Sequence, residues 1–230
     1  MQTRVCAIAV FALAGSASAQ DFFPSLAAAG LTVRESDQVE ARFRADTTNW
    51  NTRLAFDGAP TPSDTTANTG NGRANYENQT FGFDLSYTTG SATFDLTITR
   101  PDTTTSTINM PAPDIDQLNT LSLSTSGSRG AVSLTAFEFS GGSFFVDAFP
   151  SVDTAPGGPT FSESFLYFGD AANLTAFDWS LTGDVAFGAF TRSNPSEGTK
   201  LNLRLFDTIP APGTTAMLAA GGLIAARRRR

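Results

Sequence analysis

The chain has 230 residues, of which 22 are acidic, 15 are basic and none is histidine, so its formal net charge at pH 7 is −7. The absence of histidine excludes a Ser-His-Asp triad, a Cys-His pair and any histidine-based metal site. The excess of acidic residues argues against electrostatic binding of nucleic acid.

The N-terminus has the order of parts of a secretory signal peptide. Arg4 precedes an apolar run from Val5 to Ala14, and Ala17-Ser18-Ala19 forms an Ala-x-Ala ending. We therefore expect signal peptidase to remove residues 1–19. Cys6, the single cysteine of the chain, lies in this segment, so the exported protein is expected to have no disulfide.

The next part of the chain predicts one strand and a long loop. Asp21–Thr32 reads as an irregular lead-in. Apolar and polar residues alternate from Val39 to Ala45, which predicts a half-buried strand; a helix is the alternative, because Val39 and Phe43 are four apart. Thr47–Asn78 is rich in Thr, Asn, Gly, Asp and Pro, and reads as a loop region with one short strand at Arg53–Phe56.

The most regular alternation predicts a β-hairpin with one buried face. Its apolar positions are Phe81, Phe83, Leu85 and Tyr87, then Ala92, Phe94, Leu96 and Ile98, with Thr89-Gly90-Ser91 between the two runs. Arg100–Asp116 follows as a Pro- and Thr-rich connection. Further strands are expected at Leu118–Thr125, Phe161–Phe168 and Lys200–Phe206, the last with Leu201, Leu203 and Leu205 inward, and the fold is expected to end at about Asp207.

Two similar heptapeptides suggest a weak internal repeat. Leu134–Ser140 reads LTAFEFS and Leu174–Ser180 reads LTAFDWS. Each precedes a turn signal, Gly141-Gly142 or Leu181-Thr182-Gly183, so both are expected to be hairpins of the same design. In each copy the aromatic residues would share one face and the acidic residue would point to the other.

These segments predict roughly nine to twelve short strands and no convincing helix between residues 20 and 208. The expected fold is all-β, an antiparallel two-sheet β-sandwich with a jelly-roll-like arrangement.

Arg4 and Arg227–Arg230 belong to the terminal segments that we expect to be removed. Without them, 10 basic and 22 acidic residues remain, a net charge of −12. A body of about 190 residues is the size of one domain.

The C-terminus joins a Pro-x-Pro motif, a short apolar segment and a basic end. Pro210, Ala211 and Pro212 precede an uncharged stretch, Thr214–Ala226, and the chain ends with Arg227, Arg228, Arg229 and Arg230. As a helix this stretch covers roughly 20 Å, whereas the hydrocarbon core of a bilayer is about 30 Å thick. A transient stay in the inner membrane, with the arginines on the cytoplasmic side, fits better than a permanent anchor. A plain transmembrane anchor remains an alternative; a basic tail for nucleic acid is disfavoured by the signal peptide.

This order of parts resembles the PEP-CTERM sorting signal of bacteria that make extracellular polysaccharide, in which Pro-Glu-Pro precedes an apolar stretch and a terminal Arg cluster. The resemblance covers residues 209–230 and implies recognition by an exosortase, a membrane transpeptidase-like enzyme that removes the tail. Ala211 stands where the family has Glu, so the motif is a variant. The domain over residues 20–208 resembles the choice-anchor type of β domain that carries such tails, with Asn49-Trp50 and the Gly-rich run before Phe81 as the matching features.

Carboxylates are the remaining candidates for catalysis and metal binding. A glycoside hydrolase needs two of them across a cleft, and Glu138 and Glu163 lie on expected strands. Asp102, Asp114 and Asp116 could offer oxygen ligands to calcium. No surrounding motif supports either use, so solvated side chains are the favoured interpretation, and we expect no catalytic residue, metal or cofactor.

Three aromatic residues are candidates for sugar binding. Trp50 and Tyr76 lie in polar loop sequence, where they would either bind a sugar or cap the end of the sandwich. Trp179 falls on the expected core face, which favours a packing role.

The sequence thus predicts an exported, non-enzymatic protein of the cell envelope surface or extracellular matrix, processed by signal peptidase and an exosortase. The alternative is a secreted carbohydrate-binding module that interacts with exopolysaccharide. An envelope hydrolase is a third, weaker hypothesis.

Overall fold

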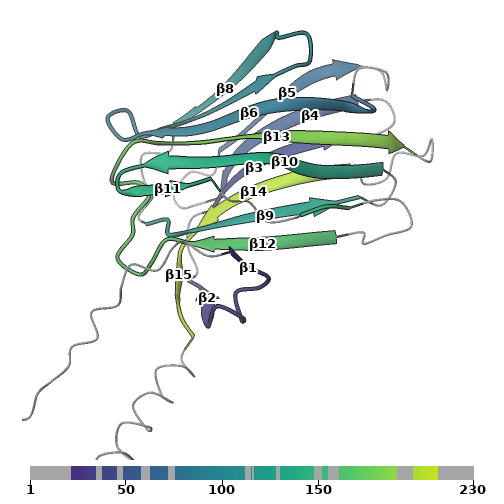
Figure 1. The fold of residues 1–230 in the computed structure, drawn as a ribbon. Coiled ribbons are helices and arrows are strands. Elements are labelled where there is room, and N and C mark those ends of the chain that lie inside the picture. Colours follow the sequence, from purple (N-terminus) through teal and green to yellow (C-terminus); the bar gives the residue numbers. More distant parts are fainter. Residues whose placement is uncertain are drawn as a thin grey trace, which may run out of the picture.

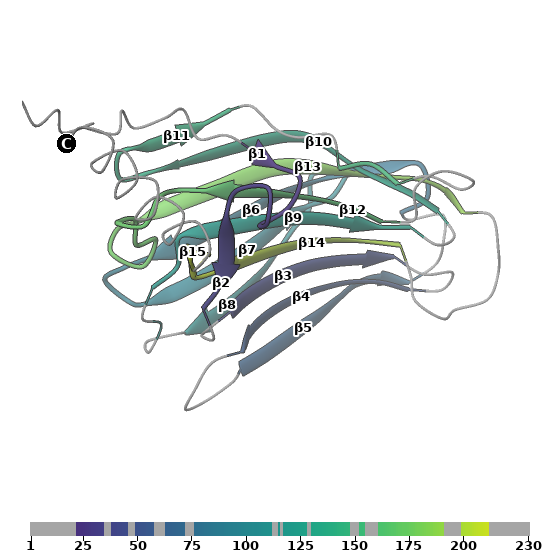
Figure 2. The same ribbon diagram turned by 90° about the horizontal axis from the view of Figure 1, so that it is seen from below.

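The chain forms two antiparallel β-sheets packed face to face, as Figures 1 and 2 show. The computed structural model describes residues 22–34, 38–45, 49–57, 63–71, 76–111, 115, 117–127, 130–147, 152–154, 161–190 and 199–211, and these contain no helix. The predicted all-β, two-sheet antiparallel sandwich is therefore confirmed. The expected signal peptide and membrane segment lie outside the described residues.

The sheets have seven and six strands, and a third, two-stranded sheet lies at one end. The seven-stranded sheet has the order β1 (Phe22–Phe23), β12 (Phe161–Tyr167), β9 (Thr120–Ser126), β14 (Thr199–Phe206), β3 (Gln38–Ala45), β4 (Asn49–Asp57) and β5 (Ser63–Asn71). The six-stranded sheet has the order β11 (Phe144–Val146), β10 (Gly130–Gly141), β13 (Trp179–Phe190), β6 (Gln79–Thr88), β7 (Thr93–Thr99) and β8 (Thr105–Pro111). The small sheet pairs β15 (Thr208–Pro210) with β2 (Leu31–Val33).

Alternation of burial along the strands places the core between the two large sheets. In β3 every second residue is buried, from Val39 to Ala45, so the strand prediction is confirmed and the helix alternative is wrong. Leu201, Leu203 and Leu205 of β14 are buried as predicted. Phenylalanines supply much of the core volume, among them Phe43, Phe81, Phe94, Phe139 and Phe187, which are all fully buried.

The predicted hairpin of residues 81–98 is present as β6 and β7. Its register pairs Phe83 with Ile98, Leu85 with Leu96 and Tyr87 with Phe94, so one face of the hairpin is apolar throughout. Ala92, expected at the start of the second strand, instead lies in the turn with a positive φ of 47°.

Two of the expected connections contain strands. Residues 47–78, predicted as a loop with one short strand, form β4 and β5, and residues 100–116 contain β8. Both β5 and β8 are edge strands, paired on one side only. Their Thr-, Ser- and Asn-rich sequences lack a strong apolar alternation, and the neighbouring strand supplies the hydrogen bonds that order them.

The two similar heptapeptides adopt different structures. The first lies in β10 and forms the predicted hairpin with β11, with Phe137 and Phe139 buried and Glu138 exposed. The second prediction is wrong, because residues 174–178 form turns and β13 continues straight through Leu181-Thr182-Gly183. The side chain of Asn173 accepts hydrogen bonds from the backbone N–H and the hydroxyl of Thr175 (3.0 and 2.7 Å), which starts this turn.

Strands also form at both ends of the described chain. The expected irregular lead-in contains β1 and β2, and the fold does not end at Asp207, because β15 continues to Pro210. Pro210 closes an edge strand, a position that needs no backbone donor.

Candidate functional site

The outer face of the seven-stranded sheet carries most of the basic side chains that the structure describes. Figure 2 shows its strands β12, β9, β14, β3, β4 and β5 side by side. Their register aligns three rows of outward residues: Phe161, Ser126, Lys200, Arg44 and Asn51; then Glu163, Ser124, Asn202, Arg42 and Arg53; then Phe165, Ser122, Arg204, Glu40 and Ala55. We call these three rows the basic face.

The described side chains of the basic face include five basic and two acidic residues. Glu40 bridges two of the arginines: Oε1 lies 3.2 Å from Nη1 of Arg53, and Oε2 lies 3.3 Å from Nε of Arg204. Glu163 instead accepts a hydrogen bond from the hydroxyl of Ser122 (2.9 Å). The face is therefore locally cationic on a chain whose net charge is −7.

Like charges lie directly opposite each other on this face. Lys200 pairs with Arg44, and Arg42 pairs with Arg53. Directly opposed like charges destabilise a sheet. Within the described ranges, no carboxylate forms an ion pair with Lys200 or Arg44.

An exposed aromatic ring lies in the same row as this uncompensated pair. Phe161 is 57% exposed, whereas most large apolar side chains of the described chain are buried. Ser126, between Phe161 and Lys200, has a small side chain, so it leaves the ring and the ammonium group accessible to one ligand. Such an arrangement can stack on a flat ligand face and neutralise an anion beside it.

The outer face of the six-stranded sheet has the opposite charge. Its outward strand residues include Asp84, Asp95, Glu138 and Asp184 but no basic residue, and we call it the acidic face. Burial raises the pKa of the Asp84 carboxyl, and the nearby charge of Asp95 raises it further. The two outer faces of the sandwich thus differ in sign.

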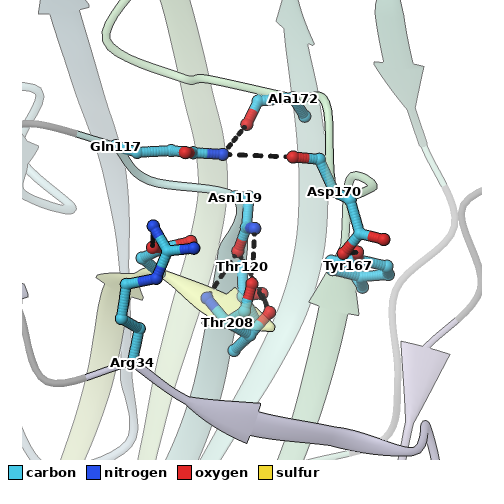
Figure 3. Close-up of polar contacts among 9 residues, drawn as sticks. Arg34, Gln117, Asn119, Thr120, Tyr167, Asp170, Ala172 and Thr208 are labelled. Atoms are coloured by element: carbon cyan, nitrogen blue, oxygen red, sulfur yellow. Dashed lines mark hydrogen bonds and ion pairs between the residues drawn. The ribbon is translucent and has the colours of Figure 1, made fainter. Parts of the chain in front are cut away.

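A second polar cluster fixes the last described strand to the sandwich (Figure 3). The side-chain amide of Asn119 pairs with the backbone of Thr208 as a neighbouring strand would: Nδ2 donates to the carbonyl and Oδ1 accepts from the N–H, both at 2.9 Å. The hydroxyls of Thr120 and Thr208 are 2.7 Å apart. Because all three residues are buried, we call this cluster the Asn119 clamp.

Charged groups beside the clamp extend it toward the surface. Arg34 Nη1 lies 3.1 Å from the buried carboxylate of Asp207. Burial raises the pKa of Asp207, while Arg34 opposes that change. Gln117 donates to the carbonyls of Asp170 and Ala172, as Figure 3 shows. The cluster holds β15 in place.

The predicted sugar-binding aromatics do not form a site in the described structure. Tyr76 has no exposed surface, so its proposed role as a platform is wrong; it packs in the core. The backbone of Trp50 lies in β4, and its side chain lies outside the described part. Trp179 is buried as expected, and its indole N–H donates to the carbonyl of Leu174 (2.7 Å).

The candidate carboxylates are also separated. Glu138 and Glu163 lie on the outer faces of different sheets, so they cannot flank one substrate. Asp102 caps a turn by accepting from the N–H and hydroxyl of Thr104, which lowers its pKa, while Asp114 and Asp116 lie outside the described residues. Within the described ranges no group of acidic side chains is arranged to hold a metal ion.

The sorting residues fall at the end of the described chain. Pro210 is in β15, and the N–H of Ala211 donates to the carbonyl of Gly30 (2.8 Å). Pro212 and Arg227–Arg230, like Ala17 and Ala19, lie outside the described residues. Among the residues that the structure describes, there is no candidate for a membrane-spanning helix.

Sequence reasoning missed the basic face because its members come from strands far apart in the chain. The available signal was the alternation Glu40, Arg42, Arg44 in one strand, with Lys200 and Arg204 in another.

Comparison with known proteins adds no assignment: no family model matches the chain, and no curated protein matches it.

Proposed function

We propose that the chain is an exported, non-enzymatic protein of the cell surface or extracellular matrix whose C-terminal tail is removed by an exosortase. The order of parts in residues 209–230 carries this proposal. The signal-peptide pattern of residues 1–19 supports export, with signal peptidase as the first processing enzyme. The inner membrane would be a transient partner, and the domain itself would remain outside the cell.

The position of β15 supports processing next to a folded domain. The Asn119 clamp holds Thr208, and Ala211 is still hydrogen-bonded to Gly30. A processing enzyme that needs an extended segment would therefore reach the chain beyond Ala211.

We also propose a jelly-roll-like topology, because successive strands from β9 to β10 and from β12 to β14 alternate between the two large sheets.

The test is the intact mass of the native protein from cell-surface and medium fractions. We expect a mass that begins at Gln20 and lacks Arg227–Arg230. Deletion of residues 212–230 should leave the fold intact and change the location. A mature mass that still includes the four arginines, or an unchanged location after the deletion, would contradict the sorting proposal.

A second candidate function is carbohydrate binding, and the basic face favours it. Phe161 offers an exposed ring beside hydrogen-bonding and charged side chains, an arrangement suited to a polysaccharide. This function would place the protein on exopolysaccharide outside the cell. Its general test is co-sedimentation with insoluble or gel-forming polysaccharides.

A further inference from the structure

One row of the basic face combines the features of a ligand site. Phe161, Ser126, Lys200 and Arg44 lie on four adjacent strands in direct register. Adjacent strands are about 4.8 Å apart, so the backbone of Phe161 is about 10 Å from that of Lys200. This separation is comparable with the length of a disaccharide.

The cations of this row have no carboxylate partner among the described residues. Lys200 and Arg44 face each other directly, which costs stability unless an anion lies between them. Arg204 and Arg53, by contrast, share Glu40. The missing counter-charge is therefore specific to the end of the face that carries Phe161.

A buried acceptor lies in the adjacent row. Asn202 is two residues from Lys200 in β14 and opposite Arg42, and it is 5% exposed. Its Oδ1 accepts no hydrogen bond from any residue that the structure describes. A hydroxyl group inserted between the neighbouring side chains would supply the donor.

We propose that Phe161, Lys200 and Arg44 bind a carboxylated polysaccharide, with a sugar ring stacked on Phe161 and a carboxylate between the two cations. This inference rests on the carbohydrate-binding function proposed above. The electron-rich face of the phenyl ring attracts the partly positive C–H groups of a sugar. Arg and Lys bind carboxylates through charge-assisted hydrogen bonds.

The acidic face of a second copy is the other occupant that charge would allow. Two copies carry the same net charge of −7, which opposes their association. A polysaccharide also explains the exposed ring, which a carboxylate on a protein surface would not require. We therefore argue for the polysaccharide and treat self-association as an outcome of the test.

The experiment measures binding of the purified full chain to polygalacturonate by isothermal titration calorimetry. Phe161→Ala, Lys200→Gln and Arg44→Gln should each weaken binding about fivefold, the effect of losing one stacking or charge-assisted contact. Raising the salt concentration should weaken binding by the parent chain and have less effect on the two charge variants. Thermal denaturation checks that each variant is folded.

Matched controls come from the other sheet. Phe145→Ala removes an exposed ring, 62% exposed, from the acidic face. Arg100→Gln removes one positive charge from the end of β7, so it matches the change in net charge. Both controls should bind polygalacturonate within about twofold of the parent chain, because neither touches the basic face.

The outcomes separate this inference from the function on which it rests. Equal binding of neutral dextran would preserve carbohydrate binding and overturn the carboxylate specificity. Equal binding of polyglutamate would overturn the sugar-stacking role of Phe161. Binding that the three variants leave unchanged would overturn the site, and no binding to any polysaccharide would overturn both proposals.

Self-association is measured by sedimentation of the protein alone at low salt. A dimer that Arg44→Gln or Lys200→Gln abolishes would place a second copy on the basic face and overturn the polysaccharide proposal. A monomer under these conditions would support a basic face that no second copy covers.

Discussion

Asp84 illustrates how a single charged residue responds to its position in a sheet. Its backbone pairs with Thr97 and Thr182 in the middle of the six-stranded sheet, and its Oδ1 is buried without a hydrogen-bond donor among the described residues. Burial and the charge of Asp95 raise its pKa above the ordinary value of 3.8. The folded chain therefore binds this proton more readily than the unfolded chain does.

The pH dependence of stability should follow from this difference. In the parent chain, the contribution of Asp84 to the free energy of unfolding rises as pH falls through its raised pKa and levels off below 3.8. We expect Asp84→Asn to raise the free energy of unfolding at neutral pH by about 0.5 kcal/mol, a small value because solvent screens a partly exposed carboxylate. The gain should vanish at about pH 3, and urea denaturation as a function of pH measures it.

Asp102→Asn is a control for which we expect the opposite change in the free energy of unfolding. Hydrogen bonds from Thr104 lower the pKa of Asp102, so its carboxylate stabilises the fold above the ordinary pKa, and this stability is lost as pH falls through the lowered value. The control should therefore lower stability at neutral pH. A loss of stability at neutral pH in Asp84→Asn as well would contradict the assigned cause.

At the scale of the element, strand β13 shows why a turn signal can be overridden. The sequence predicts a turn at Gly183, but this residue lies in the strand opposite Phe83 and Phe137. A Cβ at this position would lie 2.5 Å from the carbonyl oxygen of Ala136 and 2.7 Å from Cζ of Phe83. Glycine is needed here so that the neighbouring strands and the Phe83 ring can approach closely.

We expect Gly183→Ala to destabilise the protein by about 1–3 kcal/mol, the usual cost of overpacking a core. Gly90→Ala is the matched control, because nothing lies within 4 Å of a Cβ at that turn position. The control should change the free energy of unfolding by at most about 0.5 kcal/mol. Equal effects of the two substitutions in urea denaturation would show that close packing at Gly183 does not matter.

At the scale of the whole molecule, β15 joins the end of the described chain to the sandwich. The strand lies outside both large sheets and pairs with β2 from the beginning of the domain (Figure 1). The Asn119 clamp connects it to the loop before β9. Two distant parts of the sequence and one large sheet therefore meet at the place where the proposed sorting tail begins.

Two shortened chains test the role of this junction. A chain ending at Ala211 should keep the stability of the full chain, because it retains β15 and the clamp. A chain ending at Phe206 leaves Asn119 and Thr120 without Thr208 and should lose about 2–4 kcal/mol, since unsatisfied buried polar groups are costly. Chemical denaturation of both chains measures this difference, and equal stabilities would mean that β15 is dispensable for the fold.

The distribution of charge is also a property of the whole molecule. The basic and acidic faces come from outward positions of different sheets, and each has an exposed phenylalanine, Phe161 or Phe145. In ligand binding a polysaccharide covers the basic face, whereas in self-association the acidic face of a second copy covers it. Calorimetry and sedimentation therefore distinguish the two roles of the protein as well as testing the site.

Local patterns in the sequence were enough to predict the fold class and the most regular strands. Alternation with a period of two is a local property, and it placed the inward residues of β3, β6, β7 and β14 correctly. It also showed that Trp179 belongs in the core. The order of parts at the two ends gave the proposal for export and sorting without any tertiary information.

Strand order, register and the surfaces that depend on them follow from long-range pairing, which local patterns do not contain. The polar edge strand β5 has little apolar alternation, and β8 has only Ile108 and Met110 as buried apolar residues; both strands acquire their hydrogen bonds from a neighbour. The similar segments at 134–140 and 174–180 diverge because the turn at Asn173 and the continuous pairing of β13 with β6 and β10 outweigh local likeness. Phe161, Lys200 and Arg44 meet because pairing in a sheet joins residues that are distant in the chain, and no local pattern encodes that pairing.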